Sequence, residues 1–104
     1  MKKDSFKLNA PHKCFNVLGN ELRYKIIQSL TLSEKSVLEL CNELEEEQSK
    51  ISHSLTQLKE CSFVDFKVNG KERIYYLKSD VFTKNKPIFQ AIAEHVEKYC
   101  KYKY

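Results

Sequence analysis

Apolar positions recur at helical spacing through the first half of the chain. From Leu22 onward they fall at i, i+4, i+5 and i+8, which places them on one side of a helix. Comparable stripes follow it, and Asn20 and Ser36 stand where N-caps belong, while Gly19 is placed to stop the first helix. The pattern predicts four successive helices, over residues 11–18, 20–32, 36–44 and 48–60.

The spacing then changes from helical to strand-like. Residues 62–68 (SFVDFKV) and 72–77 (ERIYYL) are rich in β-branched and aromatic residues. The dipeptide Asn69-Gly70 between them is a strong hairpin signal, because a type I′ turn needs positive φ at both central residues. The sequence therefore predicts a β-hairpin that reverses in a type I′ turn.

A final helix is expected from about Pro87. Its apolar stripe is unusually wide: Ile88, Phe89, Ile92, Ala93, Val96, Tyr99 and Cys100. Packing within one subunit is the simpler explanation for part of this stripe. We expect the remainder to pair with a second copy of the chain, which predicts a homodimer formed through the terminal helices.

The order of these elements indicates a fold. Two helices joined by a short connection at about residues 45–47 have helix-turn-helix spacing, and a basic hairpin directly after them is typical of a wing. Lys67, Lys71 and Arg73 flank the hairpin tip, where they can reach phosphates beside a groove. The expected fold is mainly α with a β-hairpin wing, that is, a winged helix-turn-helix.

Length and charge narrow the picture further. The 104 residues suggest one domain over 11–104, preceded by a polar, flexible segment 1–10. A net charge of +4 permits nucleic-acid binding without requiring it. No apolar run has the length of a membrane span, and the basic N-terminus lacks the apolar core of a signal peptide, so we expect a cytoplasmic protein without a membrane partner.

The chain resembles the ArsR-type winged-helix repressors over roughly residues 13–100. The segment VLGNELRYKIIQSL matches the L-G-x-x-x-R-x-x-I pattern through Leu18, Gly19, Arg23 and Ile26, and VLELCNEL is similar to the family's third helix. QSKISHSLTQLKECSFVDF and NGKERIYYL resemble the recognition helix and the wing. The resemblance implies a homodimeric repressor that places helix 48–60 in the major groove and wing 67–73 on the backbone of a roughly palindromic operator on double-stranded DNA.

The expected DNA-binding side chains are polar or basic. They are Gln48, Ser49, Lys50, Ser52, His53 and Gln57 on the helix, with Lys67, Lys71 and Arg73 on the wing. The chain departs from the family in the turn, where Glu45–Glu47 replace a Gly-Leu-Ser type sequence. Three carboxylates near a DNA backbone are unfavourable, and they motivate an alternative: a winged-helix protein-interaction module without sequence-specific DNA binding.

The four cysteines raise the question of an effector. Cys100 lies among lysines, which favour the reactive thiolate. Two Cys100 residues can approach each other if the terminal helices of two copies pair, or Cys14 can be the partner, so Cys14 and Cys100 are candidates for thiol sensing by which a redox or other effector releases the DNA. Cys41 and Cys61 are consistent with small buried hydrophobic residues.

The metal sites of the family are present only as fragments. Cys41-Asn42-Glu43 lacks the second thiolate of the arsenic/cadmium type, and 80–82 with 95–98 retain part of the zinc type. A nonstandard site from His12, Cys14 and Cys41 across subunits stays open, but we expect no metal and no cofactor. No glycine-rich phosphate loop, nucleophile elbow or paired catalytic carboxylates are evident, so an enzyme is not expected.

Overall fold

The computed structural model describes residues 11–78, 82 and 88–102. This part of the chain forms five helices and a three-stranded antiparallel sheet. In chain order the elements are α2 (Pro11–Leu18), α3 (Glu21–Leu32), β1 (Lys35–Ser36), α4 (Val37–Leu44), α5 (Gln48–Glu60), β2 (Val64–Asn69), β3 (Glu72–Leu77) and α6 (Ile88–Tyr99). The predicted helices and hairpin are confirmed, while segment 1–10 lies outside the described residues.

The core forms where the apolar helix faces meet one side of the sheet. Its buried residues are Ile26, Ile27 and Leu30 of α3, Leu40 of α4, Ile51, Leu55 and Leu58 of α5, Val64 and Tyr75 of the sheet, and Phe82. Burial of these side chains is the main favourable contribution to folding. It also fixes the rotation of α5, so that the polar face of this helix is turned outward.

The sheet contains a strand that periodicity did not predict. The order is β1-β3-β2, so β3 is central, and Lys35 pairs with Tyr75 while Ser36 pairs with Ile74. β1 has only two residues, too few to show an alternating pattern. The short strand nevertheless attaches the hairpin to the segment that leads directly into α4.

The hairpin turn differs from the predicted type. Asn69 pairs with Glu72, which leaves Gly70 and Lys71 as the central residues. Gly70 has a φ of 67°, whereas neither Asn69 nor Lys71 is among the residues with positive φ. This matches a type II′ turn, which needs positive φ only at its first central residue. The type I′ prediction was wrong because strand register, rather than the Asn-Gly dipeptide, decides which residues occupy the turn.

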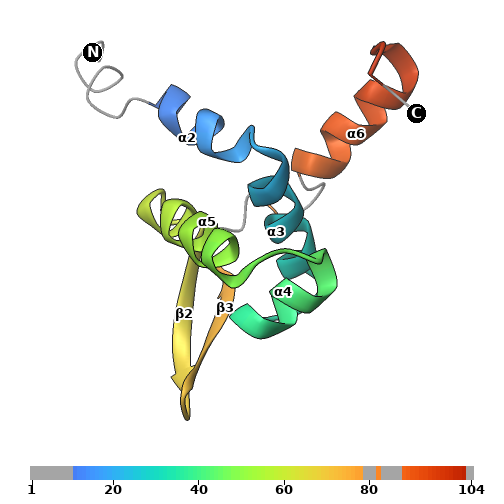
Figure 1. The fold of residues 1–104 in the computed structure, drawn as a ribbon. Coiled ribbons are helices and arrows are strands. Elements are labelled where there is room, and N and C mark those ends of the chain that lie inside the picture. The colour runs from blue at the N-terminus through green and yellow to red at the C-terminus, as the bar shows by residue number, and fades with distance from the viewer. Residues whose placement is uncertain (1–10, 79–81, 83–87, 103–104) are drawn as a thin grey trace, which may run out of the picture.

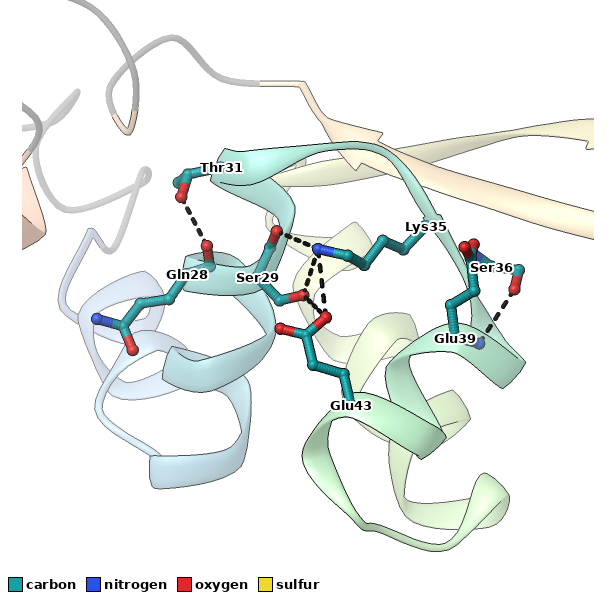
Figure 2. A network of polar contacts seen from close by, with 7 residues as sticks. All are labelled: Gln28, Ser29, Thr31, Lys35, Ser36, Glu39 and Glu43. Atoms are coloured by element: carbon teal, nitrogen blue, oxygen red, sulfur yellow. Dashed lines mark hydrogen bonds and ion pairs between the residues drawn. The ribbon is translucent and has the colours of Figure 1, made fainter.

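A polar network joins α3, β1 and α4, as Figure 2 shows. The Lys35 ammonium donates to the Ser29 carbonyl at 2.7 Å and to the Ser29 hydroxyl at 2.9 Å, and it lies 3.3 Å from the Glu43 carboxylate. The buried Ser29 hydroxyl donates to Glu43 at 2.8 Å. The hydrogen bond from Ser29 is the largest cause that lowers the pKa of Glu43; burial opposes it, and the hydrogen bond and charge of Lys35 add to the decrease.

Both predicted N-caps are present. The Asn20 side chain accepts from the Arg23 backbone N–H at 3.1 Å at the start of α3. Ser36 and Glu39 form a reciprocal capping box at the start of α4 (Figure 2). These contacts satisfy backbone donors that have no partner within the helix itself.

Figure 1 shows the hairpin projecting from one end of the molecule, with α2 and α6 extending from the other. α6 contacts the core through Phe89, whose ring centroid lies 4.6 Å from that of Tyr24 and 5.3 Å from that of Phe82. Among the described residues, no helix is long and apolar enough to cross a lipid bilayer.

Candidate nucleic-acid interface

The turn between α4 and α5 is three residues long. Glu45 adopts the left-handed conformation (φ 54°, ψ 52°), and its backbone N–H donates to the Cys41 carbonyl. Helices commonly end at a residue in this left-handed conformation, and glycine is the residue most often found at that position. Glu47 then precedes α5 as an N-cap whose side chain makes no capping hydrogen bond.

The acidic turn is partly neutralised by its own surroundings. The Glu46 side chain is partly buried, lies 3.6 Å from the Lys50 ammonium, and accepts the Glu47 backbone N–H at 3.3 Å. A carboxylate at this place also suits the positive N-terminal end of α5. Glu46 therefore interacts with groups of its own chain, which partly offset its negative charge. This reduces the repulsion of DNA phosphates that we expect from three consecutive glutamates.

One groove brings helix and wing residues together. It has a volume of about 350 Å³ and lies between the start of α4, the outer face of α5 and the wing. Its lining residues are Ser36, Val37, Leu38, Gln48, Ser52, Thr56, Lys71, Glu72, Arg73 and Tyr75. We call this surface the wing-side groove. It contains four of the predicted site residues, and it adds Thr56 and Leu38, which were not selected from the sequence.

The other predicted helix residues lie on the opposite flank of α5. Lys50, His53 and Gln57 line a second groove of about 480 Å³, together with residues at the start of α3. We call it the α3-side groove. Ser49 is exposed but lines neither groove. Seven of the nine predicted residues therefore divide between two surfaces that share one helix, while Ser49 and Lys67 line neither.

Gln57 is engaged within the chain. The Arg23 guanidinium donates to the Gln57 side-chain oxygen at 2.6 Å and to the Val17 carbonyl at 2.6 Å. Arg23 thereby joins the end of α2 to the middle of α5. Periodicity could not reveal this contact, because residues 23 and 57 are far apart in sequence and each looks like an ordinary polar position.

The three basic side chains of the wing differ in the contacts that they already make within the chain. Arg73 stacks on Phe66, with the guanidinium carbon 4.5 Å from the ring centroid, and Lys71 is exposed at the turn. Lys67 forms an ion pair with Glu34 at 2.8 Å, and the hydrogen bond and charge of Glu34 raise the pKa of this lysine. The wing thus carries two available cations and a third that is already paired.

Thiol sensing by Cys14 and Cys100 stays a prediction; all four cysteines are free thiols. Cys14 on α2 is among the groups that influence the thiol of Cys61, at the C-terminal end of α5. Burial is the main cause that raises the pKa of the Cys61 thiol to about 11; Cys14 and Glu60 add to the increase, and Arg23 opposes it. Cys41 and Cys100 are partly buried.

Metal ligands are dispersed over the described residues. No group of three or more His, Cys, Asp or Glu side chains lies close enough there to hold a metal ion. The His95 ring lies 5.2 Å from that of Tyr99 on α6. Asp80, part of the zinc-type fragment, lies outside the residues that the structure describes.

Comparisons with known proteins agree with this architecture. A family model described as "Bacterial regulatory protein, arsR family" matches residues 20–65, which include α3, α4 and α5. The putative arsenical resistance operon repressor ArsR of Halobacterium salinarum is 41% identical over 70 residues, covering 65% of this chain and 54% of that protein. The chain thus spans about half the length of this curated relative.

Two solved structures extend the comparison across the chain. HlyU from Vibrio cholerae N16961 is 28% identical, with a TM-score of 0.66, and the match covers 97% of this chain and all of that one. The homodimeric winged helix-turn-helix DNA-binding domain of Mb0332 from Mycobacterium bovis has a TM-score of 0.73 at 18% identity, covering 93% and 86% of the two chains, which shows the fold alone. That protein is described as a possible ArsR-family transcriptional regulator.

These relatives are regulators rather than enzymes, as the sequence led us to expect. The matched segment contains the helix-turn-helix, and the structural likeness adds the wing and terminal helices. Residues 20–65 therefore match the arsR family of bacterial regulatory proteins, within a chain whose fold is that of the winged helix-turn-helix regulators.

Proposed function

We propose that this chain is a homodimeric transcriptional repressor that binds double-stranded DNA through α5 and the wing. The observation that carries the proposal is the wing-side groove, where polar groups of α5 face the same concavity as Lys71 and Arg73. A helix in the major groove with a cationic wing on the flanking backbone needs this arrangement.

Within this proposal the two flanks of α5 have different tasks. Gln48, Ser49 and Ser52 read base edges with Thr56, while Lys71 and Arg73 hold phosphates. Lys50 and His53, on the α3-side groove, contact the backbone of the other strand. Gln57 contributes by holding α5 against Arg23, and Lys67 is the weakest of the wing contacts because Glu34 shares its charge.

The dimer interface in this proposal consists of α2 and α6. Phe15 is 65% exposed, Ile92 52% and Tyr99 76%, and the two helices extend from the same end of the molecule (Figure 1). A second copy would cover these side chains and place the two α5 helices about a two-fold axis. The operator is then roughly palindromic, with half-sites about one helical turn apart.

The direct test is fluorescence anisotropy with DNA from upstream of the gene and with a scrambled duplex, across a salt series. We expect sequence-selective binding whose affinity falls steeply with salt. The double variant Lys71→Ala with Arg73→Ala should bind more weakly, and its log–log salt slope should decrease by about 0.9 for each phosphate that the wing no longer neutralises.

The matched control removes the same charge elsewhere. Lys98→Ala with Lys101→Ala takes two exposed lysines from the end of α6 and its continuation, and it should leave the slope nearly unchanged. Equal, weak binding of both duplexes by the unmodified protein would contradict the repressor proposal. That result would favour the protein-interaction module, for which the acidic turn Glu45–Glu47 is the available surface.

A further inference from the structure

Leu38 is an apolar side chain on the otherwise polar outer face of α4. The helix has four exposed residues, and the other three carry carboxylate or amide groups: Glu39, Asn42 and Glu43. The side of α4 that packs on the core is supplied by different residues, namely Val37, Leu40, Cys41 and Leu44. Because 62% of Leu38 is exposed, packing within the chain does not explain why a leucine stands there.

Thr56 contributes a second apolar group from the neighbouring helix. Its hydroxyl donates to the Ser52 carbonyl at 3.0 Å, one turn earlier in α5. Since a threonine has a single donor, this exposed side chain has no hydrogen left to donate, and it offers its methyl group to a partner. Leu38 and Thr56 both line the wing-side groove, and we call them the apolar pair.

The surroundings of the apolar pair indicate what covers it. The other exposed side chains of the groove are polar or charged: Gln48, Lys71, Glu72 and Arg73. Cations outnumber the single carboxylate, so the groove suits a partner that carries negative charge beside a small apolar group. Duplex DNA has this combination, because phosphates flank the major groove and thymine is the one base that presents a methyl group there.

We propose that Leu38 and Thr56 are specificity-determining residues that contact the C5-methyl groups of thymines in double-stranded DNA. The inference rests on the proposed function, and it adds which base the operator carries opposite the wing-side groove. It also gives α4 a part in reading DNA, through a residue outside the set selected from the sequence.

Deoxyuridine tests the methyl group alone. It pairs as thymidine does and keeps the O4 acceptor, but it lacks the C5-methyl group. The probe is a duplex that the full chain binds selectively, taken from upstream of the gene or selected from a random-sequence library. Thymines are replaced by deoxyuridine one position at a time, in both half-sites together, and each dissociation constant is measured by fluorescence anisotropy.

We expect one or two sensitive thymine positions in each half-site. Losing the burial of one methyl group should weaken binding about fourfold, and therefore about 15-fold for two half-sites. Thymines at other positions should be replaced with little effect.

Variants of the apolar pair assign the contact. Leu38→Ala should reduce the uracil effect at one sensitive position to less than about twofold, because a contact shared by two groups is lost when either is removed. Thr56→Ser removes the methyl group and keeps the hydroxyl that bonds to Ser52, and it should act in the same way at a neighbouring position. Both side chains are exposed, so the variants should unfold thermally as the native chain does.

Leu32→Ala is the matched control. It removes the same atoms from a leucine that is 79% exposed at the end of α3 and lines neither groove. Every uracil effect should remain as in the native chain. Leu38→Ala should also leave the salt slope unchanged, in contrast to Lys71→Ala with Arg73→Ala, because it removes no phosphate contact.

Two results would overturn the inference while the proposed function stands. One is selective binding with no uracil-sensitive position, and the other is a sensitivity that persists in both Leu38→Ala and Thr56→Ser. Loss of the sensitivity in Val68→Ala instead would place the methyl contact on the wing, where Val68 is 69% exposed. Equal, weak binding of every duplex by the native chain would contradict the repressor proposal itself, and the thymine contact with it.

Discussion

Glu45 holds a backbone conformation that suits glycine better than glutamate. Its φ of 54° makes it one of two residues other than glycine with positive φ in the described part of the chain, the second being Ser62. The left-handed conformation brings Cβ close to the following carbonyl and costs roughly 1–2 kcal/mol for a residue with a side chain. The tight turn into α5 therefore depends on tertiary packing to hold Glu45 in place.

Replacing this residue should release that strain. We expect Glu45→Gly to raise the free energy of unfolding by about 1 kcal/mol, after the greater freedom of glycine in the unfolded chain is counted. Glu45→Ala is the matched control, because it removes the same carboxylate but keeps Cβ. Urea denaturation followed by circular dichroism measures both, and equal stabilities of the two variants would assign any gain to charge instead of backbone.

Lys67 and Lys71 also differ at the scale of single residues. Because Glu34 lies 2.8 Å from the Lys67 ammonium, we expect Lys67→Ala to reduce DNA affinity less than Lys71→Ala does. Glu34→Gln should free Lys67 and tighten binding, and Lys67→Ala should then cost more in the Glu34→Gln background than in the native chain. Anisotropy titrations give the four constants, and strict additivity would show that the pair has no influence on DNA contact.

At the scale of elements, the Ser29–Lys35–Glu43 network connects α3, β1 and α4. Because the folded pKa of Glu43 is lowered, its ionised form stabilises the fold above the unfolded pKa of about 4.5, and this contribution is lost as pH falls through the depressed folded value. The Glu43 side chain is 41% exposed, so solvent screening keeps the ion pair modest.

Glu43→Gln should make this contribution measurable. We expect the variant to lose about 0.5 kcal/mol of unfolding free energy at pH 7, and the difference from the native chain to shrink as the pH falls below 4.5. Glu97→Gln, at an exposed position on α6, serves as the control. A difference that stays constant from pH 7 to pH 3 would show that Glu43 acts through shape rather than charge.

The elements that could be predicted from the sequence are those with a strong local pattern. The apolar stripes located α3, α4 and α5, and the caps at Asn20 and Ser36 fixed where two of them begin. β1 was missed because two residues carry no periodicity, and the hairpin turn was misjudged because register depends on pairing across the whole ladder. The contact of Gln57 with Arg23 joins distant segments, so no local signal could have revealed it.

At the scale of the whole molecule, α2 and α6 both expose large apolar side chains, Phe15 on the first and Ile92 and Tyr99 on the second. Under the proposed dimer, Ile92→Asp would bury a carboxylate from each subunit without a partner, at a cost of several kcal/mol. We expect the dimer dissociation constant to rise by at least about a hundredfold, measured by sedimentation. Leu32→Asp is the control, because Leu32 is 79% exposed at the end of α3 and should leave assembly unchanged.

The central position of β3 has a consequence for how DNA would be read. β1 attaches one edge of β3 to the residue that caps α4, and β2 completes the wing on the other edge. The pairing of β3 with both neighbouring strands therefore holds the helix-turn-helix and the wing at a fixed separation. A duplex whose local groove width does not fit that separation must itself bend or twist, and the free energy of this deformation depends on its base steps. Base pairs that no side chain touches would then contribute to operator choice through their stiffness.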